Sequence, residues 1–301
     1  MPRADLPTPA PERIDRRRAA NERNDYANPA FSKTLSDGLK AFYRRQFQPA
    51  RDAFEAALKI IPDNTLALSF LNASAANIPG ALDTLINTEE DAVGATSKNY
   101  FKHVRLGFSY MFASATGRDR RQDARDEFNH AVNLNAKAPA AHVALGIMRF
   151  DDRSMNLAKT EFLAALRADP NNVLAREYLG IIYQVDLKDP QRGLAYVIDI
   201  PNLVPGYADI DFHIGSILDD LKQYNEALKY LTTGLQLDTA SVGESGQHGY
   251  VLIGRIYLEQ HKITDATRAF KSAIANKTDV TIAKTWLNKI QRGDFDAPKK
   301  T

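Results

Sequence analysis

The segment of 34 residues from Pro139 to Asn172 most constrains how this chain can fold. It contains two runs of apolar residues at helical spacing, separated by the polar segment Asp151–Ser154. Ser154 suits the N-cap of the second helix, and Pro170 lies in a sequence typical of a helix end. The apolar positions are Val143, Leu145, Gly146 and Phe150 in the first run, and Leu157, Ala158, Phe162, Ala165 and Leu166 in the second. Because neither helix can bury its stripe alone, the pair requires neighbours of the same kind.

The same two-helix unit recurs along the chain. Each copy carries a glycine in its first helix, a small residue in its second, and a bulky residue four positions after the small one. The glycines are Gly38, Gly107, Gly146, Gly180, Gly215 and Gly254; the small residues are Ala50, Ala124, Ala158, Gly193, Ala227 and Ala266; the bulky residues are Phe54, Phe128, Phe162, Val197, Leu231 and Phe270. Successive small positions from Ala124 to Ala227 are 34, 35 and 34 residues apart. Copies in register at a constant period indicate a repeat protein.

This period and these residue types resemble the tetratricopeptide repeat (TPR) family, whose unit is about 34 residues. The family's marks are Leu145, Gly146, Ala158, Phe162, Ala165 and Pro170, and again Tyr250, Ile253, Gly254, Tyr257, Ala266, Phe270 and Ala273. The resemblance covers roughly residues 31–290. It implies an all-α fold, a right-handed solenoid of antiparallel helix pairs, with a concave face lined by the first helix of each pair. Small residues at the crossing would let the helices approach to about 8–10 Å, and the bulky residue would fill the space between successive pairs.

We predict about seven TPR-like units, one of them degenerate, followed by a capping helix. Residues 1–30 hold five prolines and the run Arg16–Arg18, and are expected to form a disordered or extended arm. The units are expected near residues 31–64, 65–99, 100–138, 139–172, 173–207, 208–246 and 247–280, the capping helix at 281–292 and a polar tail at 293–301. The unit at 65–99 is degenerate because Asn72 replaces the glycine, Pro79 cuts the hairpin early, and Asn87–Lys98 has the composition of a loop.

The composition argues against several classes of protein. Lys and Arg total 39 against 37 Asp and Glu, a net charge of +2, whereas nucleic-acid binders usually carry a strongly basic face. The absence of cysteine removes thiol catalysis, disulfides and thiolate metal sites. No run of about 18 apolar residues predicts a transmembrane helix, and the first residues lack the apolar segment of a secretory signal. We therefore expect a cytoplasmic protein, or a periplasmic or exported one if a signal sequence has been removed.

No catalytic constellation is predicted. The six histidines include no i, i+4 pair of the zinc-binding type, and His103 and His142 occupy equivalent places in their units, as repeat packing would require. Gly243, Gly246 and Gly249 do not form a dinucleotide-binding fingerprint. The carboxylate pairs, such as Asp151-Asp152, lie at expected hairpin turns, where turn chemistry accounts for them. We expect neither catalytic activity nor a cofactor or a metal.

A partner would bind the concave face, which the family's geometry assigns to positions 2, 5, 9 and 12 of each first helix. The candidate groove residues are Phe101, Val104, Phe108, Val143, Ile147, Phe150, Glu177, Ile181, Phe212, Asp219, His248 and Arg255. The groove is predicted to be apolar from Phe101 to Phe150 and more polar towards Arg255. Its apolar part would receive a peptide or an amphipathic helix, or else would be filled by neighbouring first helices or by the N-terminal arm.

The sequence is compatible with three functions. The resemblance favours a non-enzymatic scaffold or adaptor that binds a protein or peptide partner. The alternative is a structural assembly protein that associates with itself or bridges subunits of a larger complex. A third reading is an accessory subunit that docks on an enzyme or a nucleic acid through Arg118, Arg120, Arg121 and Arg125; the balanced charge makes the nucleic acid unlikely.

Overall fold

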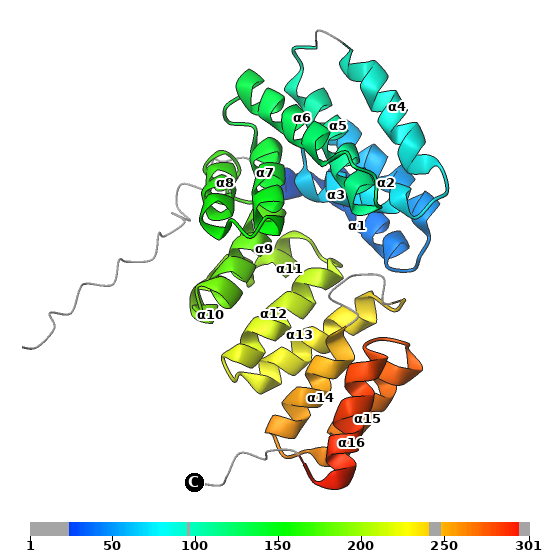
Figure 1. Ribbon diagram of the computed structural model, residues 1–301, viewed down its shortest axis with the longest axis vertical. Helices are drawn as coiled ribbons and strands as arrows, with labels where there is room; N and C mark the ends of the chain where they lie inside the picture. Colours follow the sequence, from blue (N-terminus) through cyan, green and yellow to red (C-terminus); the bar gives the residue numbers. More distant parts are fainter. Residues whose placement is uncertain (1–23, 95–96, 241–247, 295–301) are drawn as a thin grey trace, which may run out of the picture.

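The computed structural model describes residues 24–94, 97–240 and 248–294, and within these ranges every regular element is a helix. The helices of the first four pairs are α1 (Pro29–Phe42), α2 (Phe47–Ile60), α3 (Thr65–Ala76), α4 (Ala81–Val93), α5 (Tyr100–Ala115), α6 (Arg121–Leu134), α7 (Pro139–Asp151) and α8 (Met155–Ala168). The others are α9 (Val173–Ile181), the π-helical turn η3 (Ile182–Asp186), α10 (Pro190–Val197), α11 (Ile200–Leu203), α12 (Ala208–Asp220), α13 (Tyr224–Leu237), α14 (Gly249–Glu259), α15 (Ile263–Ala275) and α16 (Val280–Arg292). Consecutive helices form antiparallel pairs that stack along the molecule (Figure 1). The predicted all-α solenoid is confirmed.

A glycine and a bulky residue form the seam of most pairs. A Cβ atom added to Gly146 would lie 2.6 Å from Phe162 Cε1, and one added to Gly107 would lie 2.5 Å from Phe128 Cε1. Only a hydrogen in place of the side chain lets α7 and α8 cross this closely. Phe162 also stacks on Tyr178 of the next pair, with ring centroids 5.1 Å apart. The repeat marks therefore act within a pair and between pairs.

Helix α3, in the degenerate unit, is buried on nearly all sides. It packs against α1, α5 and α9, which belong to three other units. It is therefore enclosed by the curved array and does not lie within one of its two helix layers. Asn72, which replaces the glycine, is fully buried; its Nδ2 donates to the Leu68 carbonyl and its Oδ1 accepts a 2.9 Å bond from the Ser109 hydroxyl. Part of the segment 87–98, expected to be a loop, is helical because α4 continues to Val93.

Contacts between residues far apart in sequence stabilise the curvature of the array. Tyr43 Oη donates to Asp209 Oδ2 over 2.8 Å, and the rings of Phe70 and Tyr207 meet edge to face with centroids 5.8 Å apart. Thr65 Oγ1 donates to Asn172 Oδ1 over 3.1 Å. These bonds join α1 and α3 to the segments around α9 and α12.

The chain ends differ in part from the expectation. Of the predicted N-terminal arm, residues 1–23 lie outside the described part, whereas residues 24–30 are folded. The short 3-10 helix η2 (Asp25–Ala27) is attached through Asn64 Nδ2, which donates to the buried Asp25 carboxylate over 3.0 Å. At the other end α16 covers α15, with Trp286 stacked on Phe270 at a centroid distance of 6.1 Å. Residues 241–247, at the junction of the predicted units 208–246 and 247–280, and the end of the predicted tail lie outside the described residues.

Candidate functional site

The apolar part of the predicted groove belongs to the core. Val104, Phe108 and Val143 are at most 1% exposed, and Ile147 is 9% exposed. Helix α3 packs against α5 and α9, so the chain's own helices occupy this side of the first-helix face. Phe101 and Phe150 are half-buried, and Phe150 packs edge to face on Tyr178 with centroids 5.2 Å apart. The expected open apolar groove is therefore corrected: self-packing, the other reading of the sequence, accounts for it.

Two further candidates serve internal packing. Phe212 is 1% exposed, and Cβ atoms added to Gly234 and Gly249 would lie 2.9 and 2.7 Å from its Cε1 atom. Glu177 is buried and accepts a 2.6 Å hydrogen bond from Tyr207 Oη. Burial and the Glu177 carboxylate together raise the pKa of Tyr207 well above its ordinary value of 10.0. Neither side chain is available to a partner.

The accessible candidates lie on the later first helices. Ile181 and Asp219 are partly exposed, and His248 and Arg255 are exposed. His248 lies at the start of α14, where its Nδ1 is 2.5 Å from Asp279 Oδ2 at the start of α16. It joins the two helix starts, whereas Asp219 and Arg255 belong to a set of polar residues on η3, α12 and α14.

We define the polar groove segment as Gln184, Ser216, Asp219, Asp220, Arg255 and Glu259. Gln184 Nε2 donates to Ser216 Oγ over 3.2 Å and to Asp220 Oδ2 over 2.6 Å, which joins η3 to α12. Gln184 lies in the π-helical turn, an uncommon element that occurs frequently at functional sites. The set therefore spans three successive units of the array.

The polar groove segment carries more negative than positive charge. Burial is the main cause that raises the pKa of Asp219 above its ordinary value of 3.8. Arg255 opposes this rise, whereas Asp220 and Glu259 add to it, so the four charged groups act on one another. No carboxylate of the described residues forms an ion pair with Arg255 within 4.0 Å. Three carboxylates and one guanidinium thus remain able to interact with a partner.

The register of the repeat already places Gln184 and Ser216 on the first-helix face, at positions 12 and 9 of their helices. Asp220 and Glu259 were not among the predicted groove residues. Asp220 and Glu259 follow position 12 directly, at the hairpin turn, where acidic residues were explained by turn chemistry alone. Only the bond from Gln184 to Asp220 distinguishes this carboxylate from an ordinary turn residue.

The arginines considered for nucleic-acid docking are compensated by carboxylates. Arg118 pairs with Asp83, and Arg120 Nη2 lies 3.1 Å from Glu90 Oε1. The remaining two share Asp152: Arg121 Nη2 lies 2.6 Å from its Oδ1 and Arg125 Nη2 lies 3.0 Å from its Oδ2. These ion pairs join neighbouring helices, so the four arginines do not form an unpaired basic face.

No group of three or more His, Asp or Glu side chains in residues 24–94, 97–240 and 248–294 is arranged to hold a metal ion. Across the same part of the chain, no helix is both long enough and apolar enough to cross a bilayer.

The tetratricopeptide repeat family model matches residues 211–241, which include most of α12 and all of α13. No curated protein is similar enough in sequence to count as a relative. Among solved structures, YrrB, a TPR protein with an unusual peptide-binding site, has a TM-score of 0.52 at 19% identity and covers 67% of this chain and 99% of its own. PilF of Pseudomonas aeruginosa has a TM-score of 0.52 at 13% identity over 86% of this chain and 97% of its own. Human IFIT1, solved as a dimer with PPP-AAAA, has a TM-score of 0.56 at 15% identity over 82% and 59%. At these identities the structures share a fold with the chain.

Proposed function

We propose that this chain, a tetratricopeptide-repeat protein, is a protein-interaction scaffold that holds a partner peptide on the polar groove segment. One observation carries the proposal: the first-helix face is filled by the chain itself along α5 and α7, whereas Asp219, Asp220 and Arg255 remain accessible on α12 and α14. The peptide-binding site of YrrB supports a peptide as the ligand class.

The charge of the segment selects the partner. Carboxylates of Asp219, Asp220 and Glu259 outnumber the single guanidinium of Arg255, so a peptide with Lys or Arg side chains is complementary. Ile181 is partly exposed next to η3 and offers an apolar contact. In this proposal the protein performs no catalysis, and the side chains orient a bound segment.

The test is a selection from an immobilised library of random 12-residue peptides. Peptides enriched by the natural protein should contain Lys or Arg, and their enrichment should be lost with Asp219→Lys/Glu259→Lys. The matched control is Asp91→Lys/Glu226→Lys, which makes the same charge change at exposed positions on α4 and α13. The proposal fails if the groove variant enriches the same peptides as the natural protein, or if the control loses them equally.

The size of the protein in solution distinguishes a structural assembly protein from the proposed peptide-binding scaffold. Sedimentation that depends on protein concentration, and that Asp219→Lys/Glu259→Lys abolishes, would assign the groove to a second copy. A cytoplasmic location stays a prediction from the sequence, to be tested by cell fractionation.

A further inference from the structure

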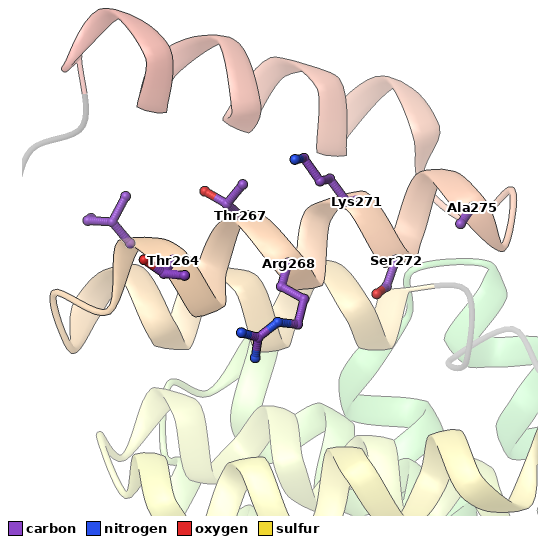
Figure 2. Close-up of a pocket in the computed structure, with 7 residues that line it drawn as sticks. Thr264, Thr267, Arg268, Lys271, Ser272 and Ala275 are labelled. Atoms are coloured by element: carbon purple, nitrogen blue, oxygen red, sulfur yellow. The ribbon is translucent and has the colours of Figure 1, made fainter.

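The outer face of α15 contains an open hollow of about 600 Å³. We call it the α15 furrow; it is lined by Ile263, Thr264, Thr267, Arg268, Lys271, Ser272 and Ala275. These residues form a stripe that follows one side of the helix from its first turn to its last, and α16 runs beside it (Figure 2). The furrow is therefore elongated, like the surface that receives a helix, and lies on a second helix of a pair, away from the polar groove segment.

The furrow lies in a basic segment of the chain. Residues 262–292 contain seven Lys and Arg against two Asp, a net charge of +5, whereas the whole chain has +2 and the remainder is therefore −3. Helix α16, beside the furrow, contains Lys284, Lys289 and Arg292 and no acidic residue. A nearly neutral chain thus presents one strongly basic helix pair.

Much of this charge is not compensated. Arg268 pairs with Asp265 one turn away over 3.0 Å, but its side chain is 73% exposed. Lys271 is exposed, and within residues 24–94, 97–240 and 248–294 no carboxylate lies within 4.0 Å of its ammonium group. This differs from Arg121 and Arg125, which are held by Asp152. The furrow consequently retains positive charge that a partner can neutralise.

We propose that the α15 furrow docks an acidic amphipathic helix of a second protein. Helix α15 has 13 residues and is about 20 Å long, so it matches a partner helix of three to four turns. Arg268 and Lys271 face the partner's carboxylates in the middle, and the hydroxyls of Thr264, Thr267 and Ser272 donate hydrogen bonds to the same groups. Ile263 and Ala275 provide apolar contacts at the two ends. The protein then binds a basic segment on one face and an acidic helix on another, which is the property of an adaptor.

The test measures fluorescence anisotropy with a labelled 14-residue helical peptide of Glu, Ala and Leu. A peptide with Lys in place of Glu, single-stranded oligo-dT and vesicles containing phosphatidylserine are measured in parallel. The furrow variant is Arg268→Glu/Lys271→Glu. Its control is Lys98→Glu/Lys137→Glu, with the same charge change at exposed loop positions far from α15 along the chain. Circular dichroism verifies that both variants fold.

The expected result is that the Glu peptide binds more tightly than the Lys peptide, and that the furrow variant weakens it by about tenfold while the control leaves it within twofold. Asp219→Lys/Glu259→Lys should leave this binding intact, which separates it from the proposed function. Equal weakening by the furrow and control variants would overturn the proposal, as would oligo-dT or vesicles binding where the Glu peptide does not. Concentration-dependent sedimentation lost only in the furrow variant, without peptide binding, would assign the furrow to a second copy instead.

Discussion

Tyr43 at the end of α1 donates a hydrogen bond from Oη to Asp209 Oδ2, at a distance of 2.8 Å and across 166 residues of sequence. Tyr43 is 1% exposed, and burial and the Asp209 carboxylate raise its pKa well above its ordinary value of 10.0. The bond connects the first helix pair with α12. It helps to determine how tightly the array curls, and thereby which part of the first-helix face stays open.

Replacing Tyr43 tests whether its hydrogen bond to Asp209 stabilises the curvature of the array. Tyr43→Phe removes a buried donor and should lower the free energy of unfolding by about 1–3 kcal/mol, as for other buried hydrogen bonds left incomplete. Hydrogen exchange should accelerate most in α1 and α12. In a double-mutant cycle with Asp209→Ala, which removes the acceptor, additive effects measured by urea denaturation would show that the bond contributes nothing by itself.

The seam between Gly146 and Phe162 predicts a second pair of effects. Gly146→Ala places a methyl group 2.6 Å from Phe162 Cε1 and should destabilise by about 1–3 kcal/mol, the usual cost of overpacking. Phe162→Ala should cost about 3–5 kcal/mol because it leaves a cavity. In the double variant the added methyl group occupies part of that cavity, so its cost should be smaller than the sum, as measured by thermal or urea denaturation. A strictly additive result would mean that the two positions are not in contact.

The burial of Phe108 predicts a contrast between two apolar residues. Phe108→Ala should lower the free energy of unfolding by about 3–5 kcal/mol because the ring is fully buried against Phe128. Leu157→Ala should change it by less than about 0.5 kcal/mol, since Leu157, expected in an apolar stripe, is 52% exposed. Urea denaturation measures both. If both variants lost similarly little free energy of unfolding, Phe108 would be exposed and the predicted apolar groove would be open.

The pair formed by His142 and Glu161 makes stability depend on pH. His142 Nδ1 lies 2.8 Å from Glu161 Oε2, and this hydrogen bond is the largest cause that raises the pKa of His142 above 6.5 and lowers the pKa of Glu161 below 4.5. The raised histidine pKa stabilises the fold fully below pH 6.5 and no longer above the folded value. The lowered glutamate pKa stabilises it above pH 4.5 and is lost as the pH falls through the folded value.

The contribution of the pair is therefore greatest between about pH 4.5 and 6.5. The stability difference between the natural protein and His142→Gln should be larger at pH 6 than at pH 8.5, measured as the difference in melting temperature. Lys159→Gln, at a partly exposed position on α8, serves as the control and should show no such change. A difference for His142→Gln that is constant across this range would contradict the prediction.

Local marks were sufficient to predict the helix pairs. The spacing of Gly146, Ala158 and Phe162 expresses the requirement that two helices cross closely, and this requirement depends on residues within one unit of sequence. The same holds for the degenerate unit, in which Asn72 and Pro79 predicted a departure from the repeat pattern. The enclosed position of α3 depends on contacts with α1, α5 and α9, and no residue pattern within the unit predicts it.

The candidate site, too, was predictable only in part from the sequence. The register of the repeat predicted that Asp219 and Arg255 lie on the first-helix face, because position within a helix determines which side a residue occupies. It predicted the same for Val104 and Phe108, which the structure buries. The register predicts which side of a helix a residue occupies, but it does not predict which other helices pack against that side.

The sequence by itself determined the repeat, the helix pairs, the glycine seams and the absence of a cysteine-based chemistry, since each follows from residue identity at short separations. Only the tertiary structure decided that the apolar half of the groove is closed, that Asp219, Asp220 and Arg255 stay accessible, and that the α15 furrow is open. The physical reason is that the curl is set by a few contacts between distant units, such as Tyr43 with Asp209 and Phe70 with Tyr207. Such contacts follow from the accumulated rotation of successive pairs, a quantity that no single repeat encodes.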